Sequence, residues 1–190
     1  MSENARGSRT SLWLIGVLCL APVVASYFAF YFAPPARHTN YGELLATGPL
    51  PDARLELADG TPFQLSRLRG KWLLLMVDSG ACDEFCRRKL FVLRQLRLTQ
   101  GKDMERIECA WLIADDVAPE AAVTGDFPGM WFVRAAGSEL LGQLPAARVL
   151  ADHIYVVDPL GNLVLRYPRD ADPGRIIKDL VRLLKTSRIG

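Results

Sequence analysis

Two cysteines four residues apart, Cys82 and Cys86, are the side chains of this sequence best suited to redox or metal chemistry. They follow the continuous apolar run 72–77, which is typical of a fully buried strand. They open the segment 82–98, which has helical periodicity, and side chains four residues apart on a helix share one face. The spacing therefore predicts two sulfur atoms that form a disulfide or bind one soft metal ion together.

Charged neighbours bear on the reactivity of these cysteines. A helix N-terminus stabilises negative charge, and the cations Arg87, Arg88 and Lys89 follow the second cysteine. Both effects lower the pKa of a thiol and favour the thiolate, which binds metals and attacks disulfides. Asp83 and Glu84 act in the opposite direction. We expect a partly exposed, reactive pair; a structural disulfide, or two buried cysteines that are merely close, is the alternative.

One histidine is the third candidate. His153 precedes an apolar strand, 154–157, in a loop that we expect to approach the helix 82–98. Two thiolates and one imidazole form a soft three-ligand set that suits copper, whereas a structural zinc site takes a fourth protein ligand. A purely structural or solvated role for this histidine stays open. The other histidine, His38, is expected to face solvent.

The remaining cysteines have simpler interpretations. Cys109 lies in the apolar strand 107–114, where a small buried side chain is the ordinary expectation. Cys19 lies in an apolar run near the N-terminus. Neither is therefore assigned to a site.

A run of cations lies within the predicted helix 82–98. Its members are Arg87, Arg88, Lys89, Arg94 and Arg97. Such a run is usually a solvated helix face, and this is the interpretation that we prefer. Docking of an acidic partner is the alternative.

Length and charge limit the classes of function. The chain has 190 residues, which allows one ordinary domain and a short extra element. Three of its 23 Lys and Arg residues lie in the first 37 positions, together with one of its 21 Asp and Glu residues. Residues 38–190 are therefore neutral overall and lack the basic footprint of a nucleic-acid binder.

An uncharged run at 12–33 predicts a membrane segment. At about 1.5 Å per residue it is long enough to cross the hydrocarbon core of a bilayer. Trp13 near one end and Tyr27 and Tyr31 near the other suit the two headgroup regions. A cleaved signal peptide would have a shorter apolar region and a small-residue cleavage site, so we expect a single uncleaved transmembrane helix.

Flanking cations predict the orientation of this helix. Arg6 and Arg9 lie on its N-terminal side, whereas Arg37 is alone on the other. This bias favours a cytoplasmic N-terminus, 1–11, and a C-terminal domain outside the cytoplasm. In a bacterium the chain would lie in the inner (cytoplasmic) membrane with its domain in the periplasm, where dithiols tend to be oxidised.

The rest of the chain predicts a tether and one α/β domain. Proline and glycine punctuate residues 34–53, the expected tether, and strand and helix signals alternate over 54–187, the expected domain. The expected elements are a hairpin around 58–61, strands at 72–77 and 107–114, a hairpin around 158–161, and helices at 82–98, 138–144 and 175–185. We expect Phe85, Val92 and Leu96 on the apolar face of the first helix. This order predicts a central mixed sheet flanked by helices.

These residues, in this order, resemble the Sco/SenC proteins, which are membrane-anchored, thioredoxin-fold copper-binding factors of cytochrome c oxidase assembly. The resemblance covers about residues 50–185, and its first part, 57–72, is similar to the opening hairpin that Sco, peroxiredoxin and TlpA proteins share. Cys82-x-x-x-Cys86 is similar to the Sco metal motif. Asp152-His153 before the hairpin 155–161 is similar to the Sco copper histidine.

The resemblance implies a thioredoxin-like fold in a divergent, trimmed relative. It implies copper held by Cys82, Cys86 and His153, and delivery of this copper to a cytochrome c oxidase subunit at the membrane. Two alternatives stay open. In a thiol–disulfide oxidoreductase of TlpA type, Cys82 and Cys86 would be catalytic toward a thiol partner protein, and the chain would be an enzyme. In a structural assembly factor, the two cysteines would only staple the start of the helix.

Overall fold

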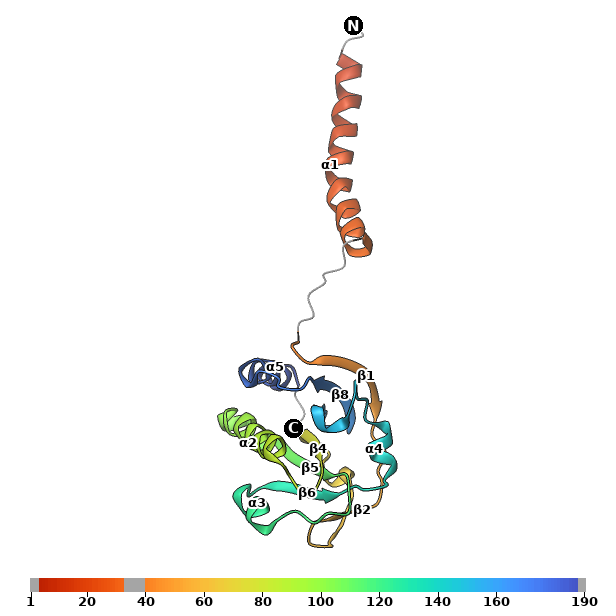
Figure 1. The fold of residues 1–190 in the computed structure, drawn as a ribbon. Coiled ribbons are helices and arrows are strands. Elements are labelled where there is room, and N and C mark those ends of the chain that lie inside the picture. Colours follow the sequence, from red (N-terminus) through yellow and green to blue (C-terminus); the bar gives the residue numbers. More distant parts are fainter. Residues whose placement is uncertain (1–3, 33–39, 188–190) are drawn as a thin grey trace. The chain divides into compact units, whose positions relative to one another are not determined.

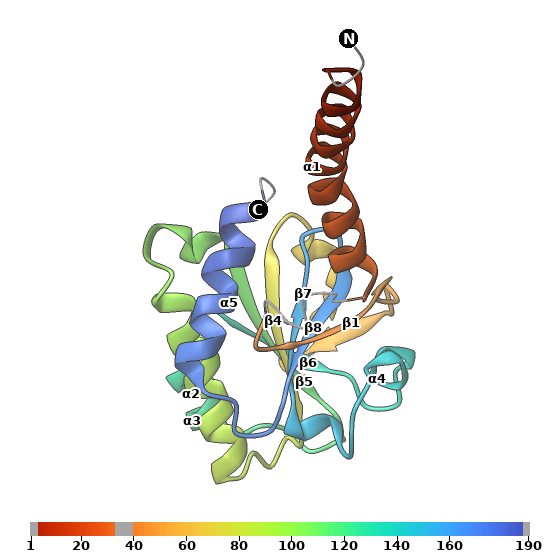
Figure 2. The same cartoon turned by 90° about the horizontal axis from the view of Figure 1, so that it is seen from above.

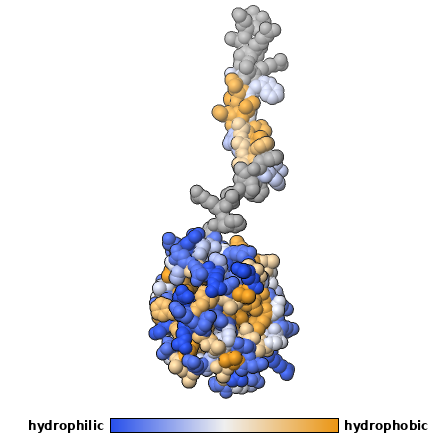
Figure 3. All heavy atoms as spheres, viewed as in Figure 1, coloured by the Kyte–Doolittle hydropathy of each residue, from blue (hydrophilic) through white to orange (hydrophobic). Residues whose placement is uncertain are grey.

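The computed structural model describes residues 4–32 and 40–187, and the chain divides into two compact units, Met1–Thr39 and Asn40–Gly190 (Figure 1). The described part of the first unit is the helix α1 (Asn4–Phe32), on which large apolar side chains such as Trp13, Leu20 and Tyr27 are exposed (Figure 3). Within the described parts of the chain, no helix meets the length and hydropathy needed to traverse a bilayer. The membrane span at 12–33 stays a prediction, and His38 lies outside the described residues.

The second unit is built on an eight-stranded sheet in the order β1-β8-β7-β4-β5-β6-β2-β3. The strands are β1 (Glu43–Pro49), β2 (Leu55–Leu57), β3 (Pro62–Phe63), β4 (Trp72–Asp78), β5 (Ile107–Ile113), β6 (Met130–Arg134), β7 (Ile154–Val157) and β8 (Asn162–Tyr167). Strand β4 pairs parallel with β5, and β5 with β6, whereas β4 pairs antiparallel with β7 and β7 with β8. The predicted mixed sheet is confirmed.

Helices cover both faces of this sheet. They are α2 (Glu84–Leu98), α3 (Ala121–Asp126), α4 (Glu139–Gln143) and α5 (Pro173–Thr186), with short 3-10 turns η1 (Leu65–Leu68), η2 (Gly101–Arg106) and η3 (Leu150–Asp152). Helices α2 and α5 lie on one face and α4 on the other (Figure 2). The fold therefore has two hydrophobic cores, which we call the α2-side core and the α4-side core.

Strand β4 shows why the sequence reads as a continuous apolar run. Its side chains alternate between the two cores, with Leu74 and Met76 on the α2 side and Leu73 and Leu75 on the α4 side. All four are buried. A strand covered on both faces needs apolar residues at every position, so the absence of alternation marks the centre of the sheet.

Helix α2 is rotated relative to the prediction. Its buried apolar side chains include Leu90, Leu93 and Leu96, whereas Phe85 and Val92 are only half-buried. The helix starts at Glu84, because the Asp83 carboxylate caps it by accepting a hydrogen bond of 2.8 Å from the Cys86 amide. The expected start at residue 82 was therefore early.

The sheet also begins earlier than predicted. Residues 43–49 were assigned to the tether, but they form β1, which pairs antiparallel with β8. The buried Asp179 carboxylate of α5 accepts hydrogen bonds from the amides of Tyr41 and Gly42, at 2.7 and 2.9 Å, and so holds the start of this segment. Glycine and proline in β1 are tolerated because β1 is an edge strand.

Candidate functional site

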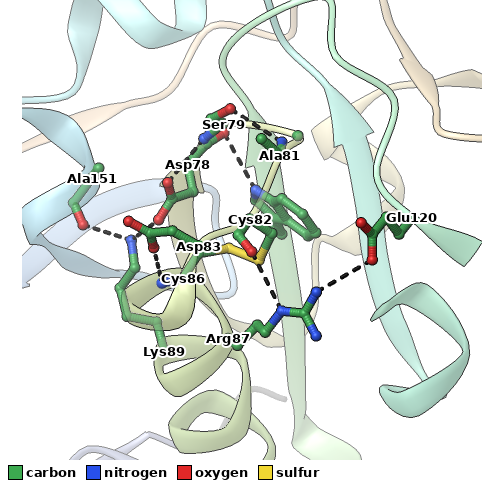
Figure 4. The surroundings of a disulfide bond; sticks show 12 residues. Asp78, Ser79, Ala81, Cys82, Asp83, Cys86, Arg87, Lys89, Glu120 and Ala151 are labelled. Atoms are coloured by element: carbon green, nitrogen blue, oxygen red, sulfur yellow. Dashed lines mark hydrogen bonds and ion pairs between the residues drawn. A yellow bond between two sulfur atoms is a disulfide. The ribbon is translucent and has the colours of Figure 1, made fainter. Parts of the chain in front are cut away.

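Cys82 and Cys86 form a disulfide between the end of β4 and the first turn of α2, with their Cα atoms 5.1 Å apart (Figure 4). Cys86 belongs to the helix, but Cys82 precedes it and has a positive φ of 40°. This conformation is uncommon for a residue other than glycine. The prediction that the two cysteines share one face of the helix is therefore wrong. A tight turn before the helix brings the sulfur atoms together instead.

The disulfide is not the partly exposed group that we expected. Cys82 is 3% exposed and Cys86 is fully buried, and both belong to the α2-side core. A disulfide is attacked in line by a thiolate, so access to one sulfur is required for exchange. In this structure that access needs a movement of the turn that carries Cys82.

A loop of the neighbouring strand holds this turn in place. The Asp115 carboxylate, which follows β5, accepts hydrogen bonds from the amides of Gly80 (2.9 Å) and Val117 (3.2 Å). Hydrogen bonds from Ser79, then from Gly80 and Val117, lower the pKa of this carboxyl below 3.8. Gly80 packs so closely against the Val117 carbonyl that a Cβ atom would overlap it.

Arg87 makes a second connection between the same two segments. Its Nε donates to the Cys82 carbonyl oxygen at 3.4 Å, and its guanidinium lies 3.3 Å from the Glu120 carboxylate (Figure 4). Both side chains are more than half exposed, so this ion pair adds little stability on its own. It places an exposed cation beside the turn at Cys82.

A buried ion pair on the other side of the disulfide was missed by the sequence analysis. Lys89 Nζ lies 2.6 Å from Asp78 Oδ2 and donates to the carbonyl oxygens of Val77 (3.1 Å) and Ala151 (2.6 Å) (Figure 4). Burial lowers the pKa of Lys89 below 10.5, against the opposing effect of Asp78. The position of Lys89 among the apolar residues on the inner face of the helix could have revealed this pair. The sequence analysis assigned Lys89 to a solvated basic face instead.

The structure does not bring His153 to the cysteines. Its imidazole is 5% exposed, and both nitrogens already have partners. Nδ1 lies 2.9 Å from the Tyr167 carbonyl oxygen, and Nε2 accepts from the Ala147 amide at 3.3 Å. Because a carbonyl only accepts, the contact with Tyr167 requires the proton on Nδ1.

The reason is the alternation of side chains along β7. Ile154 belongs to the α2-side core, and Tyr155 belongs to the α4-side core. His153 is two residues from Tyr155, contacts its ring edge at 5.9 Å between centroids, and bonds to the segment after α4. It therefore lies on the face of the sheet opposite to the disulfide.

No group of three or more His, Cys, Asp or Glu side chains that would hold a metal occurs among residues 4–32 and 40–187. The donor set fits copper only in part. The two sulfur donors lie together but are bonded to each other, and the imidazole of His153 is hydrogen-bonded at another place. The metal role of Cys82, Cys86 and His153 stays a prediction. Cys109 is buried, as expected, and burial raises its pKa to about 12. Cys19 is exposed on α1.

Comparisons with known proteins give the fold a context. A family model described as a transmembrane-like, thioredoxin-like, C-terminal domain matches residues 72–187. No curated protein matches the chain. Among solved structures, apo Sco1 of Thermus thermophilus is 25% identical, with a TM-score of 0.59 over 78% of this chain and 99% of that one.

Two further Sco structures are similar at lower identity. Copper-bound yeast Sco1 is 18% identical, with a TM-score of 0.59 over 74% of this chain and 92% of that one. BsSco, a member of the Sco family of cytochrome c oxidase assembly proteins with an identified disulfide switch, is 13% identical, with a TM-score of 0.58 over 74% and 94%. The thioredoxin-like fold and the similarity to Sco proteins are confirmed.

Proposed function

We propose a function for this chain from its membership of the family of transmembrane-like, thioredoxin-like C-terminal domains. The chain is a Sco-like assembly factor that works by thiol–disulfide exchange at Cys82 and Cys86. The observation that carries this proposal is the position of the disulfide, between the central strand β4 and the start of α2. The partner is a protein with a cysteine pair, as expected for a cytochrome c oxidase subunit that awaits copper.

The short sequence separation favours a redox role over a staple. A disulfide stabilises a fold mainly by restricting the unfolded chain, and the restriction grows with the length of the closed loop. Here only four positions separate the two cysteines, and both already lie in one turn that Asp115 and Asp83 hold. The bond therefore adds little that the surrounding hydrogen bonds do not already provide.

The exchange proceeds through two attacks by thiolates. A thiolate of the partner attacks one sulfur, forms a mixed disulfide and releases the other cysteine as a thiolate, which takes up a proton. The second thiolate of the partner then attacks the mixed disulfide. The partner is oxidised by two electrons and gains a disulfide, while Cys82 and Cys86 become a dithiol; the reverse sequence reduces a partner disulfide.

Trapping of the mixed disulfide tests this proposal. In the full chain, Cys86→Ser leaves Cys82 free, and Cys82→Ser leaves Cys86 free. We expect one of these variants to attack a peptide that contains an intramolecular disulfide and to accumulate the mixed disulfide as a covalent adduct. Cys109→Ser is the matched control, because Cys109 is buried and outside the pair. No adduct with either single variant would contradict the proposal and leave the structural staple.

Binding of copper(I) to the reduced pair is a second candidate. It is favoured by two sulfur donors at one point and by copper-bound yeast Sco1 among the similar structures. Copper is then cargo for the oxidase, and the two thiolates are its ligands. A third ligand from His153 would need this side chain to leave both hydrogen-bond partners and to change face, so we propose a site of two sulfur ligands.

A competition titration separates these arrangements. The reduced full chain is titrated with copper(I) against a chromophoric chelator under anaerobic conditions. We expect Cys82→Ser and Cys86→Ser to lose binding, and His153→Gln to keep the affinity of the parent chain within about threefold. Loss of copper in His153→Gln, with an intact fold by circular dichroism, would instead support the three-ligand set Cys82, Cys86 and His153.

We also propose that residues 12–33 anchor the chain in the inner membrane, with residues 1–11 in the cytoplasm and the domain in the periplasm. The support is the uncharged run and the excess of Arg6 and Arg9 over Arg37. Cysteine labelling of intact spheroplasts tests the orientation. A membrane-impermeant maleimide is expected to label the cysteine of Asp52→Cys. It is expected to leave the cysteine of Glu3→Cys unlabelled.

A further inference from the structure

A hollow beside the C-terminal half of α2 lies outside the disulfide site. It has a volume of about 180 Å³, and its lining includes Arg94, Arg97, Leu98, Cys109, Phe127 and Met130. We call it the arginine hollow. We propose that it docks an acidic segment of a partner protein that carries apolar side chains between its carboxylates.

Two fixed cations form the rim of the arginine hollow. Arg94 donates to the Asp126 carbonyl oxygen at 3.3 Å, and Arg97 donates to the Met104 carbonyl oxygen at 3.2 Å. In the part of the chain that the structure describes, neither guanidinium forms an ion pair with a carboxylate. Each retains N–H donors that fit a carboxylate.

Gly129 makes room for one of these cations. It has a φ of +81°, and a Cβ atom there would lie 3.2 Å from a terminal nitrogen of Arg97. The guanidinium therefore lies against bare backbone. Any other residue at this position would strain the turn and would crowd the guanidinium.

The floor of the hollow is apolar and uncharged. Cys109 contributes to it, and burial raises the pKa of its thiol to about 12, so it is neutral at physiological pH. Leu98 is 48% exposed at the edge, and Phe91, on the same stripe of α2, is 55% exposed. Large apolar side chains that stay exposed beside unpaired cations are typical of a binding surface.

These features define the occupant by complementarity. Two separated guanidinium groups call for two carboxylates, and the apolar floor between them calls for an aromatic or aliphatic side chain. An acidic, amphipathic peptide segment supplies both. A lipid headgroup or a nucleic-acid phosphate supplies charge without the apolar insertion, and the domain as a whole has no excess of cations to attract either.

The hollow is connected to the disulfide by one stripe of the helix. Arg87, Phe91, Arg94 and Leu98 recur every three or four residues, so they lie in a row. The row begins where Arg87 contacts the Cys82 carbonyl oxygen and extends over about 16 Å of helix. A partner bound in the arginine hollow would thus hold its own thiols near Cys82 at high effective concentration.

Peptide binding to the full chain in detergent tests this inference. The probe is a fluorescein-labelled peptide of sequence GEFELEG, and its binding is followed by fluorescence anisotropy in low salt. We expect Arg94→Glu/Arg97→Glu to weaken binding at least tenfold, because two charge-assisted contacts become repulsive. Arg54→Glu/Arg148→Glu, with the same charge change at two exposed arginines elsewhere, is expected to leave it unchanged.

Three results would overturn the inference: no binding of GEFELEG to the parent chain, equal weakening in the control variant, or equal binding of the basic peptide GKFKLKG. Vesicles of phosphatidylglycerol that bind with the same dependence on Arg94 and Arg97 would assign the surface to lipid instead. The variant Arg94→Gln/Arg97→Gln repeats the test without charge reversal if the first variant unfolds. Because binding is measured without redox chemistry, an inert disulfide would leave this result intact.

Discussion

The ammonium group of Lys89 lies 2.6 Å from Asp78 Oδ2, within the protein and beside the turn that carries the disulfide. It also donates to the carbonyl oxygens of Val77 and Ala151, so the ammonium has three polar contacts within the protein. One side chain of α2 thus ties together the end of β4 and the segment before β7. The ion pair therefore holds the first turns of α2, which include Cys86, against the end of β4.

Removal of this lysine should destabilise the fold strongly. Lys89→Met leaves the buried Asp78 carboxylate without its cation, with only the Ser79 amide as a hydrogen-bond donor, and we expect a loss of about 3–5 kcal/mol of unfolding free energy in urea. The double variant Asp78→Asn/Lys89→Met should lose less than Lys89→Met alone, because no unpaired charge remains. Lys102→Met, at an exposed lysine, is the control. A loss below about 1 kcal/mol for Lys89→Met would contradict the role given to the pair.

Acid should loosen the turn at the disulfide. The hydrogen bonds from Ser79, Gly80 and Val117 hold the pKa of Asp115 below 3.8 in the folded state. A carboxyl with a lowered pKa stabilises the fold fully above its unfolded value, and this contribution is lost as the pH falls through the folded value. The rate of disulfide reduction by a phosphine should therefore rise below about pH 3.8.

Asp115→Asn separates this effect from general acid unfolding. The variant should be reduced several times faster than the parent chain at neutral pH and should lack the acid-dependent rise of the parent. Asp116→Asn, at the exposed neighbouring residue, is the control. A parent-like pH profile in Asp115→Asn would show that this carboxyl does not control the turn.

A methyl group at Gly80 should not be accommodated. Its Cβ would overlap the Val117 carbonyl oxygen, which belongs to the backbone and cannot turn aside as a flexible side chain could. We expect Gly80→Ala to cost about 1–3 kcal/mol and to lower the midpoint of thermal unfolding by several degrees. Gly142→Ala, where nothing lies within 4 Å, should be neutral or slightly stabilising. Equal midpoints for the two variants would exclude the close contact.

The four cysteines should differ in reactivity once the protein is reduced. Burial holds the pKa of Cys109 at about 12, so native Cys109 should resist alkylation by iodoacetamide at pH 8. Cys82 and Cys86 should be alkylated when the turn opens, whereas Cys19, within the proposed membrane segment 12–33, should be shielded by the detergent. Mass spectrometry of the digested protein gives each rate. Modification of Cys109 as fast as that of Cys86 would contradict this order.

The sequence predicted the centre of the fold better than its edges. The apolar run of β4, the turn at 158–161 and the amphipathic helix α5 follow from local pattern and are confirmed. The edge strand β1 was missed, because its pairing with β8 depends on contacts more than 110 residues away, such as Glu43 with Arg166. Strand β6 follows an irregular loop and has no strong pattern of its own.

The site shows the same limit. The proximity of Cys82 and Cys86 follows from their spacing, and the structure brings them together. The face of His153 does not follow from local pattern, because a shift of one residue in a strand moves a side chain to the other side of the sheet. The burial of both cysteines likewise depends on the loops at Asp115 and Glu120, which lie about 30 residues farther along the chain.

A redox titration of the Cys82–Cys86 pair in the full chain tests the central claim most directly. The protein is equilibrated in glutathione and dithiothreitol buffers, and the reduced fraction is counted by alkylation and mass spectrometry, with circular dichroism as a check of the fold. We predict a single two-electron transition of the folded protein with a midpoint between about −270 and −120 mV, the range of proteins that exchange disulfides. A pair that stays oxidised below about −300 mV until the chain is unfolded would contradict the account and make the bond a structural staple.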